Sequence, residues 1–199
     1  MKQEKFTLGL NLPTDPRWAN IAEKSIEEIL VDHAYCEQKA ASSCISLIIQ
    51  FPERHELVEM LTPIVAEEWA HFERVLKKLK ERGFALGKAR TDDYVKELNA
   101  GMKKGGSRDE QLVERLLVNA LIEARSCERF KTLSTNLSDD DLKVFYYELM
   151  VSEATHYRNF LDLAKTYMDP EEVMLRWNRL LKMEAEIMKS MKPRPDRMH

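Results

Sequence analysis

Glycine and proline are scarce in this sequence of 199 residues, with 6 and 7 copies, although 44% of its residues are hydrophobic and 33% are charged. Few helix breakers, together with many Glu, Lys, Leu and Ala residues, favour helix along the whole chain. The hydrophobic fraction is large enough for one globular domain with a sizeable core, which argues against an intrinsically disordered chain.

Long apolar runs are also missing. No stretch approaches the roughly 18 apolar residues of a membrane-spanning helix, and the first five residues lead into no hydrophobic core of a signal peptide. We therefore expect a cytoplasmic protein with no membrane partner.

The 3 cysteines, Cys36, Cys44 and Cys127, form no Cys-x-x-Cys motif. We expect them to be reduced residues that pack in the core.

The formal net charge of −3 conceals a basic segment. Residues 74–108 contain eleven Lys or Arg residues and four Asp or Glu residues, and residues 189–199 contain four basic residues and one acidic residue. Such an excess is compatible with an anionic partner, although solvated helix faces have similar compositions.

Apolar periodicity predicts five long helices, over residues 16–50, 53–82, 108–133, 139–167 and 170–191, with a short helical piece at 92–99. We expect Asp15 and Ser138 to cap helices, Gly83 to end one, and Pro63 to kink the second helix or mark a bulge. The long connection at 83–107 suits a crossover between parallel helices. The expected fold is therefore all-α, a ferritin-like four-helix bundle with one long crossover between the second and third helices and an extra C-terminal helix. We expect one domain, with a bundle core at about 15–167 and the extra helix at about 170–191.

Two Glu-x-x-His motifs, Glu68 to His71 and Glu153 to His156, lie within predicted helices. Residues three apart lie on one helix face, so each motif directs a carboxylate and an imidazole the same way. One such motif has little meaning because it often arises by chance. Two of them, each joined by a Glu from a neighbouring helix, form the ligand set of ferritin-like dinuclear metal bundles.

The partner carboxylates can be located by their distance from the turns, because level residues of an antiparallel helix pair are equidistant from the turn between them. Glu37 and Glu68 have their midpoint at 52.5, on the break after Pro52, and Glu123 and Glu153 have theirs at 138, in the predicted turn. Each motif therefore has one level glutamate in the neighbouring helix.

Glu128 is the rival of Glu123 on the third helix. It would lie about 7 Å off level and roughly 140° around the helix from Glu123. We therefore predict that Glu123 is the ligand.

Four carboxylates with apolar neighbours are costly to bury unless metal ions neutralise them. The predicted metal ligands are Glu37, Glu68, His71, Glu123, Glu153 and His156. Mixed carboxylate and imidazole ligands suit iron or manganese, and we expect iron. A metal-bound His usually donates its other N–H to an acceptor, for which Asp32 and Glu128 are the candidates. For any single one of these residues, a solvated position on a helix is the ordinary alternative.

Four segments together resemble one family, the tRNA 2-methylthio-N6-isopentenyladenosine hydroxylases, which are non-haem di-iron monooxygenases of bacteria. The segments are Asp32–Ala41, Glu67–Phe72, Glu123–Phe130 and Ser152–Tyr157, and the likeness covers about residues 15–190. The resemblance implies two iron ions held by the six residues above, with O₂ as co-substrate and an external electron donor, a reductase or a ferredoxin-type protein. It also implies hydroxylation of the isopentenyl group next to the anticodon, with the anticodon stem-loop of tRNA as partner. Lys103, Lys104 and Arg108 are then the expected phosphate contacts.

Two other functions fit parts of the pattern. A ferritin- or rubrerythrin-like oxidase of iron or peroxide would share the ligand set, and a storage protein of this kind would form a closed shell. A helical interaction module without enzymatic activity would stay folded and unchanged after removal of iron.

Overall fold

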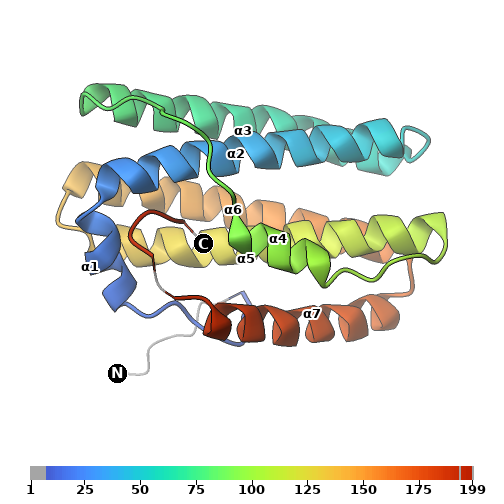
Figure 1. Ribbon diagram of the computed structural model, residues 1–199. Coiled ribbons are helices and arrows are strands. Elements are labelled where there is room, and N and C mark those ends of the chain that lie inside the picture. Colours follow the sequence, from blue (N-terminus) through green and yellow to red (C-terminus); the bar gives the residue numbers. More distant parts are fainter. Residues whose placement is uncertain (1–7, 193, 199) are drawn as a thin grey trace. The chain divides into compact units, whose positions relative to one another are not determined.

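The computed structural model describes residues 8–192 and 194–198, and every regular element within them is a helix (Figure 1). The elements are α1 (Arg17–Glu23), α2 (Ile26–Gln50), α3 (His55–Glu81), α4 (Asp93–Ala100), α5 (Arg108–Asn136), α6 (Asp140–Tyr167) and α7 (Pro170–Ser190). The prediction of an all-α fold is confirmed. Among the described residues, none of these helices combines the length and hydrophobicity that a membrane span requires.

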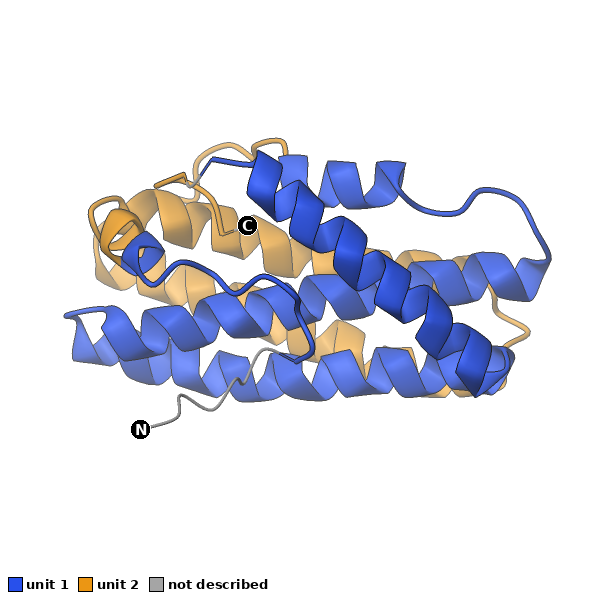
Figure 2. Ribbon diagram, turned by 90° about the horizontal axis from the view of Figure 1, so that it is seen from below, with its two compact units in different colours: residues 1–19, 92–193, 199 blue, residues 20–91, 194–198 orange. Residues whose placement is uncertain are grey.

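The chain divides into two compact units, which are coloured separately in Figure 2. Unit 1 comprises residues 1–19, 92–193 and 199, and unit 2 comprises residues 20–91 and 194–198. Unit 1 therefore holds α4 to α7. Unit 2 holds α2, α3 and a short C-terminal segment.

In unit 2, α2 and α3 pack against each other across the short connection at residues 51–54. The buried residues of α3 follow helical spacing, at Leu57, Leu61, Ile64, Glu68, His71, Phe72, Val75 and Leu79. This spacing places them on one face of the helix. The end of α3 is a Schellman motif, in which the N–H of Gly83 donates to the carbonyl of Lys80 and that of Phe84 to the carbonyl of Leu79.

In unit 1, α5 packs along α6, and α7 contacts α4, α5 and α6. Side-chain caps define where these helices begin. Ser107 and Glu110 form a capping box at the start of α5, and Asp139 accepts a hydrogen bond from the N–H of Leu142 at the start of α6. Asp169 caps α7, whose first residue is Pro170, as the sequence predicted.

Three local predictions need correction or comment. The helix expected over residues 16–50 is two helices, because the N–H of Ser25 closes a tight turn onto the carbonyl of Ala22 and the chain leaves helical geometry there. The cap of α6 is Asp139 and not Ser138, since α5 continues to Asn136 and moves the turn along the chain. Pro63 lies within a continuous α3.

A buried ionic network joins α5 to α7 within unit 1. Arg125 and Glu184 are both fully buried, and the guanidinium donates through Nε at 2.8 Å and Nη2 at 2.5 Å to Glu184 Oε1. Arg125 also donates to Glu128 at 3.0 Å, and Glu128 accepts hydrogen bonds from the backbone and hydroxyl of Thr14. Each buried charge thus has an opposite charge or a donor beside it, which burial requires.

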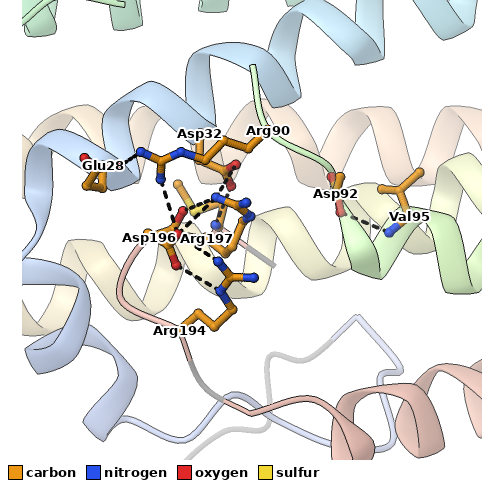
Figure 3. A network of polar contacts seen from close by, with 9 residues as sticks. Glu28, Asp32, Arg90, Asp92, Val95, Arg194, Asp196 and Arg197 are labelled. Atoms are coloured by element: carbon orange, nitrogen blue, oxygen red, sulfur yellow. Dashed lines mark hydrogen bonds and ion pairs between the residues drawn. The ribbon is translucent and has the colours of Figure 1, made fainter. Parts of the chain in front are cut away.

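The C-terminal segment, residues 194–198, anchors onto α2 within unit 2 (Figure 3). The backbone N–H of Met198 donates to Asp32 Oδ2 at 2.8 Å, and Arg197 lies 3.7 Å from Asp32 Oδ1. Asp196 accepts from Arg194 at 2.9 Å and lies 3.3 Å from Arg90, which also pairs with Glu28. Figure 3 shows these side chains turned toward one another, so the segment is held by charge pairs as well as by its backbone.

We predict that Gly83→Ala lowers the free energy of unfolding by about 1–2 kcal/mol, because Gly83 has a φ of +75° and an L-residue is strained there. A Cβ at this position would meet no atom within 4 Å, so the loss reflects the backbone alone. Gly83→Asn should lower the free energy of unfolding by less than Gly83→Ala, since Asn tolerates the left-handed region. Urea denaturation of the two variants tests the ranking, and equal losses would contradict it.

Candidate metal centre

Unit 2 contains a trio of buried side chains, Glu37 on α2 with Glu68 and His71 on α3. One donor atom from each lies within 4.8 Å of the others. His71 Nδ1 is 3.6 Å from Glu37 Oε2 and 3.7 Å from Glu68 Oε2. The three residues are no more than 6% exposed, so they face the interior and not solvent.

Unit 1 contains a matching trio, Glu123 on α5 with Glu153 and His156 on α6. One donor atom from each again lies within 4.8 Å of the others, and His156 Nδ1 is 3.5 Å from Glu153 Oε2. These residues are no more than 5% exposed. Each unit therefore brings together one glutamate and one Glu-x-x-His motif. These are the pairs predicted from their equal distances to the turn between the two helices.

Helical periodicity explains why the trios are buried. Each ligand candidate continues the row of apolar residues on the inward face of its helix. On α5 the buried row includes Leu112, Leu116, Ala120, Glu123, Cys127 and Phe130, and on α6 it includes Leu142, Leu149, Glu153, His156, Phe160 and Leu163. The polar residues thus occupy positions at which the pattern would otherwise place hydrophobic side chains.

The donors of each trio fit a divalent metal ion. Nitrogen and oxygen ligands lie about 2.0–2.2 Å from an ion, so two of them on one ion can be up to about 4 Å apart. The separations of 3.5–3.7 Å between His Nδ1 and carboxylate oxygens are within this reach but too long for good hydrogen bonds. Two carboxylates per trio would balance the charge of one divalent ion. Both imidazoles present Nδ1 to these carboxylates, so Nδ1 is their candidate ligand atom.

Asp32 and Glu128, the acceptors expected behind the candidate metal-binding His residues, have other partners. Glu128 receives hydrogen bonds from Thr14 and Arg125 and does not serve His156, so that expectation is wrong. Its position, one turn from Arg125, places it in the ionic network. Asp32 accepts from the backbone of Met198 and pairs with Arg197, a role that sequence spacing could not reveal because the two segments are far apart in the chain.

His33 was not singled out from the sequence, although it is fully buried and its Nε2 lies 2.5 Å from Glu37 Oε1. Its position four residues before Glu37 was the available clue, because such residues share a helix face.

Glu114 is a second buried residue that was not predicted from the sequence. It is buried and accepts from Arg176 and from the backbone of Lys103, which ties the loop before α5 to α7.

None of the three cysteines, all of which lie in the described part of the chain, forms a disulfide, as expected. Cys44 and Cys127 are buried as predicted, whereas Cys36 is only half-buried. Cys127 is buried on α5, and its thiol donates to the carbonyl of Met150 at 3.3 Å. Burial raises the pKa of the Cys127 thiol to about 12, so it stays protonated near neutral pH. This thiol packs in the core and is unsuited to metal binding or redox chemistry.

The three basic residues expected to contact phosphate lie around one loop of unit 1. Lys103, Lys104 and Arg108 are all exposed, at residues 101–108. Lys103 Nζ donates to Glu110 Oε1 at 2.8 Å, and this contact is the main cause that lowers the pKa of Glu110 to about 2. The ammonium group of Lys103 therefore already pairs with a carboxylate, which leaves it less positive charge to offer a phosphate.

Comparisons with known proteins identify the family of the chain. A family model described as tRNA-(MS[2]IO[6]A)-hydroxylase (MiaE) matches residues 2–199. A Pseudomonas putida protein named tRNA 2-(methylsulfanyl)-N(6)-isopentenyladenosine(37) hydroxylase is 38% identical over 164 residues, which cover 82% of this chain and 78% of the relative. A Salmonella typhimurium protein of the same name is 27% identical over 239 aligned residues, covering 94% and 85%.

A solved structure is also similar. It is described as protein 43 with aldehyde deformylating oxygenase activity from Synechococcus, and it is 32% identical with a TM-score of 0.89. The match covers 96% of this chain and 94% of that chain. The similarity confirms the ferritin-like fold class expected from the sequence.

We predict that Glu123→Ala lowers the bound iron below two ions per chain, because it removes one of the two carboxylates of the trio in unit 1, whereas Glu128→Ala leaves two irons bound. Glu128→Ala is the matched control. It removes a buried carboxylate of the same helix that pairs with Arg125. Iron analysis of both purified variants gives the stoichiometry. Two irons retained in Glu123→Ala would contradict the assignment of Glu123.

Proposed function

Since the chain belongs to the tRNA-(MS[2]IO[6]A)-hydroxylase (MiaE) family, we propose that it hydroxylates the isopentenyl group of 2-(methylsulfanyl)-N6-isopentenyladenosine at position 37 of tRNA. The observation that carries the proposal is the pair of buried trios, each with two carboxylates and one imidazole. The family supplies the substrate, and the trios supply residues able to hold the metals that such a reaction needs.

We propose that these residues hold two iron ions, one in each trio: Glu37, Glu68 and His71 in unit 2, and Glu123, Glu153 and His156 in unit 1. Iron bound there supplies the O₂-dependent oxidation that replaces a C–H bond of the prenyl group by C–OH. The reaction consumes the substrate, one O₂, two electrons and two protons, and it yields the alcohol and one water. An external reductase or ferredoxin-type donor would deliver the electrons, because the sequence has no Cys-x-x-Cys pairs to hold a rubredoxin-type iron.

The described side chains would hold the metals and keep bulk water away from them. Glutamates and imidazoles on rigid helices need little rearrangement to bind an ion. Buried apolar neighbours, such as Leu61 and Ile64 in unit 2 and Leu116 and Leu149 in unit 1, surround the trios along their helices. Such neighbours exclude water from each trio, which strengthens electrostatic interactions there.

We propose that the loop at residues 101–107 contacts the phosphates of the anticodon stem-loop. Glu114 holds this loop by accepting from the backbone of Lys103, while Arg176 donates to Glu114 and, at 3.5 Å, to the carbonyl of Gly101. The loop is thereby fixed in front of α5 with Lys104 exposed. Arg194 and Arg197 of the C-terminal segment already pair with carboxylates, so the loop is the better candidate. A tRNA substrate also implies a cytoplasmic protein.

The first test is turnover by iron-loaded, reduced protein supplied with O₂ and an anticodon stem-loop that carries the methylthio-isopentenyl adenosine. We predict that mass spectrometry of the digested nucleosides shows a gain of one oxygen atom. A stem-loop with unmodified adenosine is the substrate control, and Glu68→Ala is the protein control.

Two irons with no product under verified reduction would reject the substrate while keeping the metal centre. An aldehyde should then be tested as the substrate, with formate release as the readout, because the similar Synechococcus protein has aldehyde deformylating oxygenase activity. Absence of bound iron would reject the metal centre itself.

We predict that Lys104→Ala weakens binding of the stem-loop and makes the slope of log affinity against log salt concentration shallower by about 1. Lys103→Ala should have a smaller effect, because its ammonium is shared with Glu110. Lys143→Ala at the start of α6, where Lys143 pairs with Asp140, is the control with no expected change. Equal effects of Lys104→Ala and Lys143→Ala would contradict a specific contact at the loop.

A further inference from the structure

His33 lies on the buried face of α2, one helical turn before Glu37. It is fully buried, and its Nε2 is 2.5 Å from Glu37 Oε1. The other carboxylate oxygen of Glu37, Oε2, is the one that faces His71 Nδ1 at 3.6 Å. The two oxygens of Glu37 therefore have different neighbours. One oxygen contacts His33, and the other belongs to the trio.

The chemistry of the pair determines which group donates the hydrogen. A carboxylate that binds a metal is ionised and can only accept hydrogen bonds. His33 must then carry its proton on Nε2, and the contact is a charge-assisted N–H···O bond. With Oε1 engaged in this way, Oε2 is the oxygen left to bind a metal. The imidazole thus favours binding of Glu37 through one defined oxygen.

The C-terminal segment also contacts the helical turn that carries His33, through the neighbouring residue Asp32. Asp32 accepts the N–H of Met198 at 2.8 Å, and the Met198 side chain is fully buried. Arg197 adds an ionic contact to the same carboxylate. Fixed surroundings limit the rotation of a side chain, which is the condition under which a hydrogen bond can orient a ligand.

The second trio has a different residue at the equivalent place. Four residues before Glu123 the sequence has Asn119, a neutral amide, where α2 has an imidazole. The two trios share the ligand types but differ in the residue one turn before the lone glutamate. They are therefore chemically unequal despite their matching ligands.

We propose that His33 is a positioning residue, which fixes Glu37 so that Oε2 alone binds metal and thereby raises the metal affinity of the trio in unit 2. The inference rests on the proposed function, because it requires the trio to hold a metal ion. It goes further by assigning a role to a residue outside the six ligands and by making the two metal positions inequivalent.

Two substitutions separate the hydrogen bond from the bulk of the side chain. Counted along the side chain, the amide nitrogen of Gln is as far from Cα as His Nε2, whereas that of Asn corresponds to His Nδ1. His33→Gln can therefore still donate to Glu37, and His33→Asn cannot reach it. His55→Asn at the exposed start of α3 is the control for loss of a histidine.

The experiment titrates the full-length protein with Co²⁺ and follows visible absorption, with metal analysis after desalting and urea unfolding of the metal-free protein. We expect the control and His33→Gln to bind two Co²⁺ with nearly unchanged affinity and spectrum. His33→Asn should bind one of the two ions about 10–100-fold more weakly, with an altered spectrum for that ion. Its metal-free stability should match that of His33→Gln.

Unchanged binding of both ions by His33→Asn would overturn the inference while leaving the metal centre intact. Equal weakening in His33→Gln and His33→Asn, with equal loss of metal-free stability, would also overturn it, since the role of His33 would then be packing alone. Failure of the unsubstituted protein to bind Co²⁺ or iron would instead overturn the proposed function, and this inference with it.

Discussion

Burial of carboxylates is the constraint on which this structure depends, because an ionised carboxylate loses its hydration inside a protein and needs a cation or donors in return. Among the described residues, eight acidic side chains are buried: Asp32, Glu37, Glu68, Glu114, Glu123, Glu128, Glu153 and Glu184. Four of these pair with arginines, namely Asp32, Glu114, Glu128 and Glu184. The other four are the carboxylates of the two trios, where metal ions would provide the positive charge.

The two groups of buried carboxylates have different consequences. Arginine partners join distant segments, such as α5 to α7 through Arg125 and Glu184, and so contribute to the tertiary structure of unit 1. The carboxylates of the trios stand beside imidazoles, which is a ligand set for metals. Rigid helices hold these donors in place. The same helical spacing that builds the apolar rows therefore also builds the two trios of candidate metal ligands.

Much of the fold and of the candidate site could be predicted because it depends on local spacing. The Glu-x-x-His motifs share a face through helix geometry alone, and the pairing of Glu37 with Glu68 follows from equal distances to one short turn. The start of α7 at Pro170 and the end of α3 at Gly83 were predictable because the preferences of these residues act within a few positions. The break between α1 and α2 was missed because the apolar periodicity continues through the turn at Ser25.

By itself, the sequence determined the helices other than the break between α1 and α2, the members of each trio and the family to which the chain is similar, since all of these depend on residue types at short or regular spacings. Only the tertiary structure decided which carboxylates take arginine partners, that Asp32 receives the C-terminal segment and that His33 contacts Glu37. The physical reason is that periodicity defines the face on which a side chain lies but not the atom it meets. That atom depends on rotamers and on segments that approach from far along the chain.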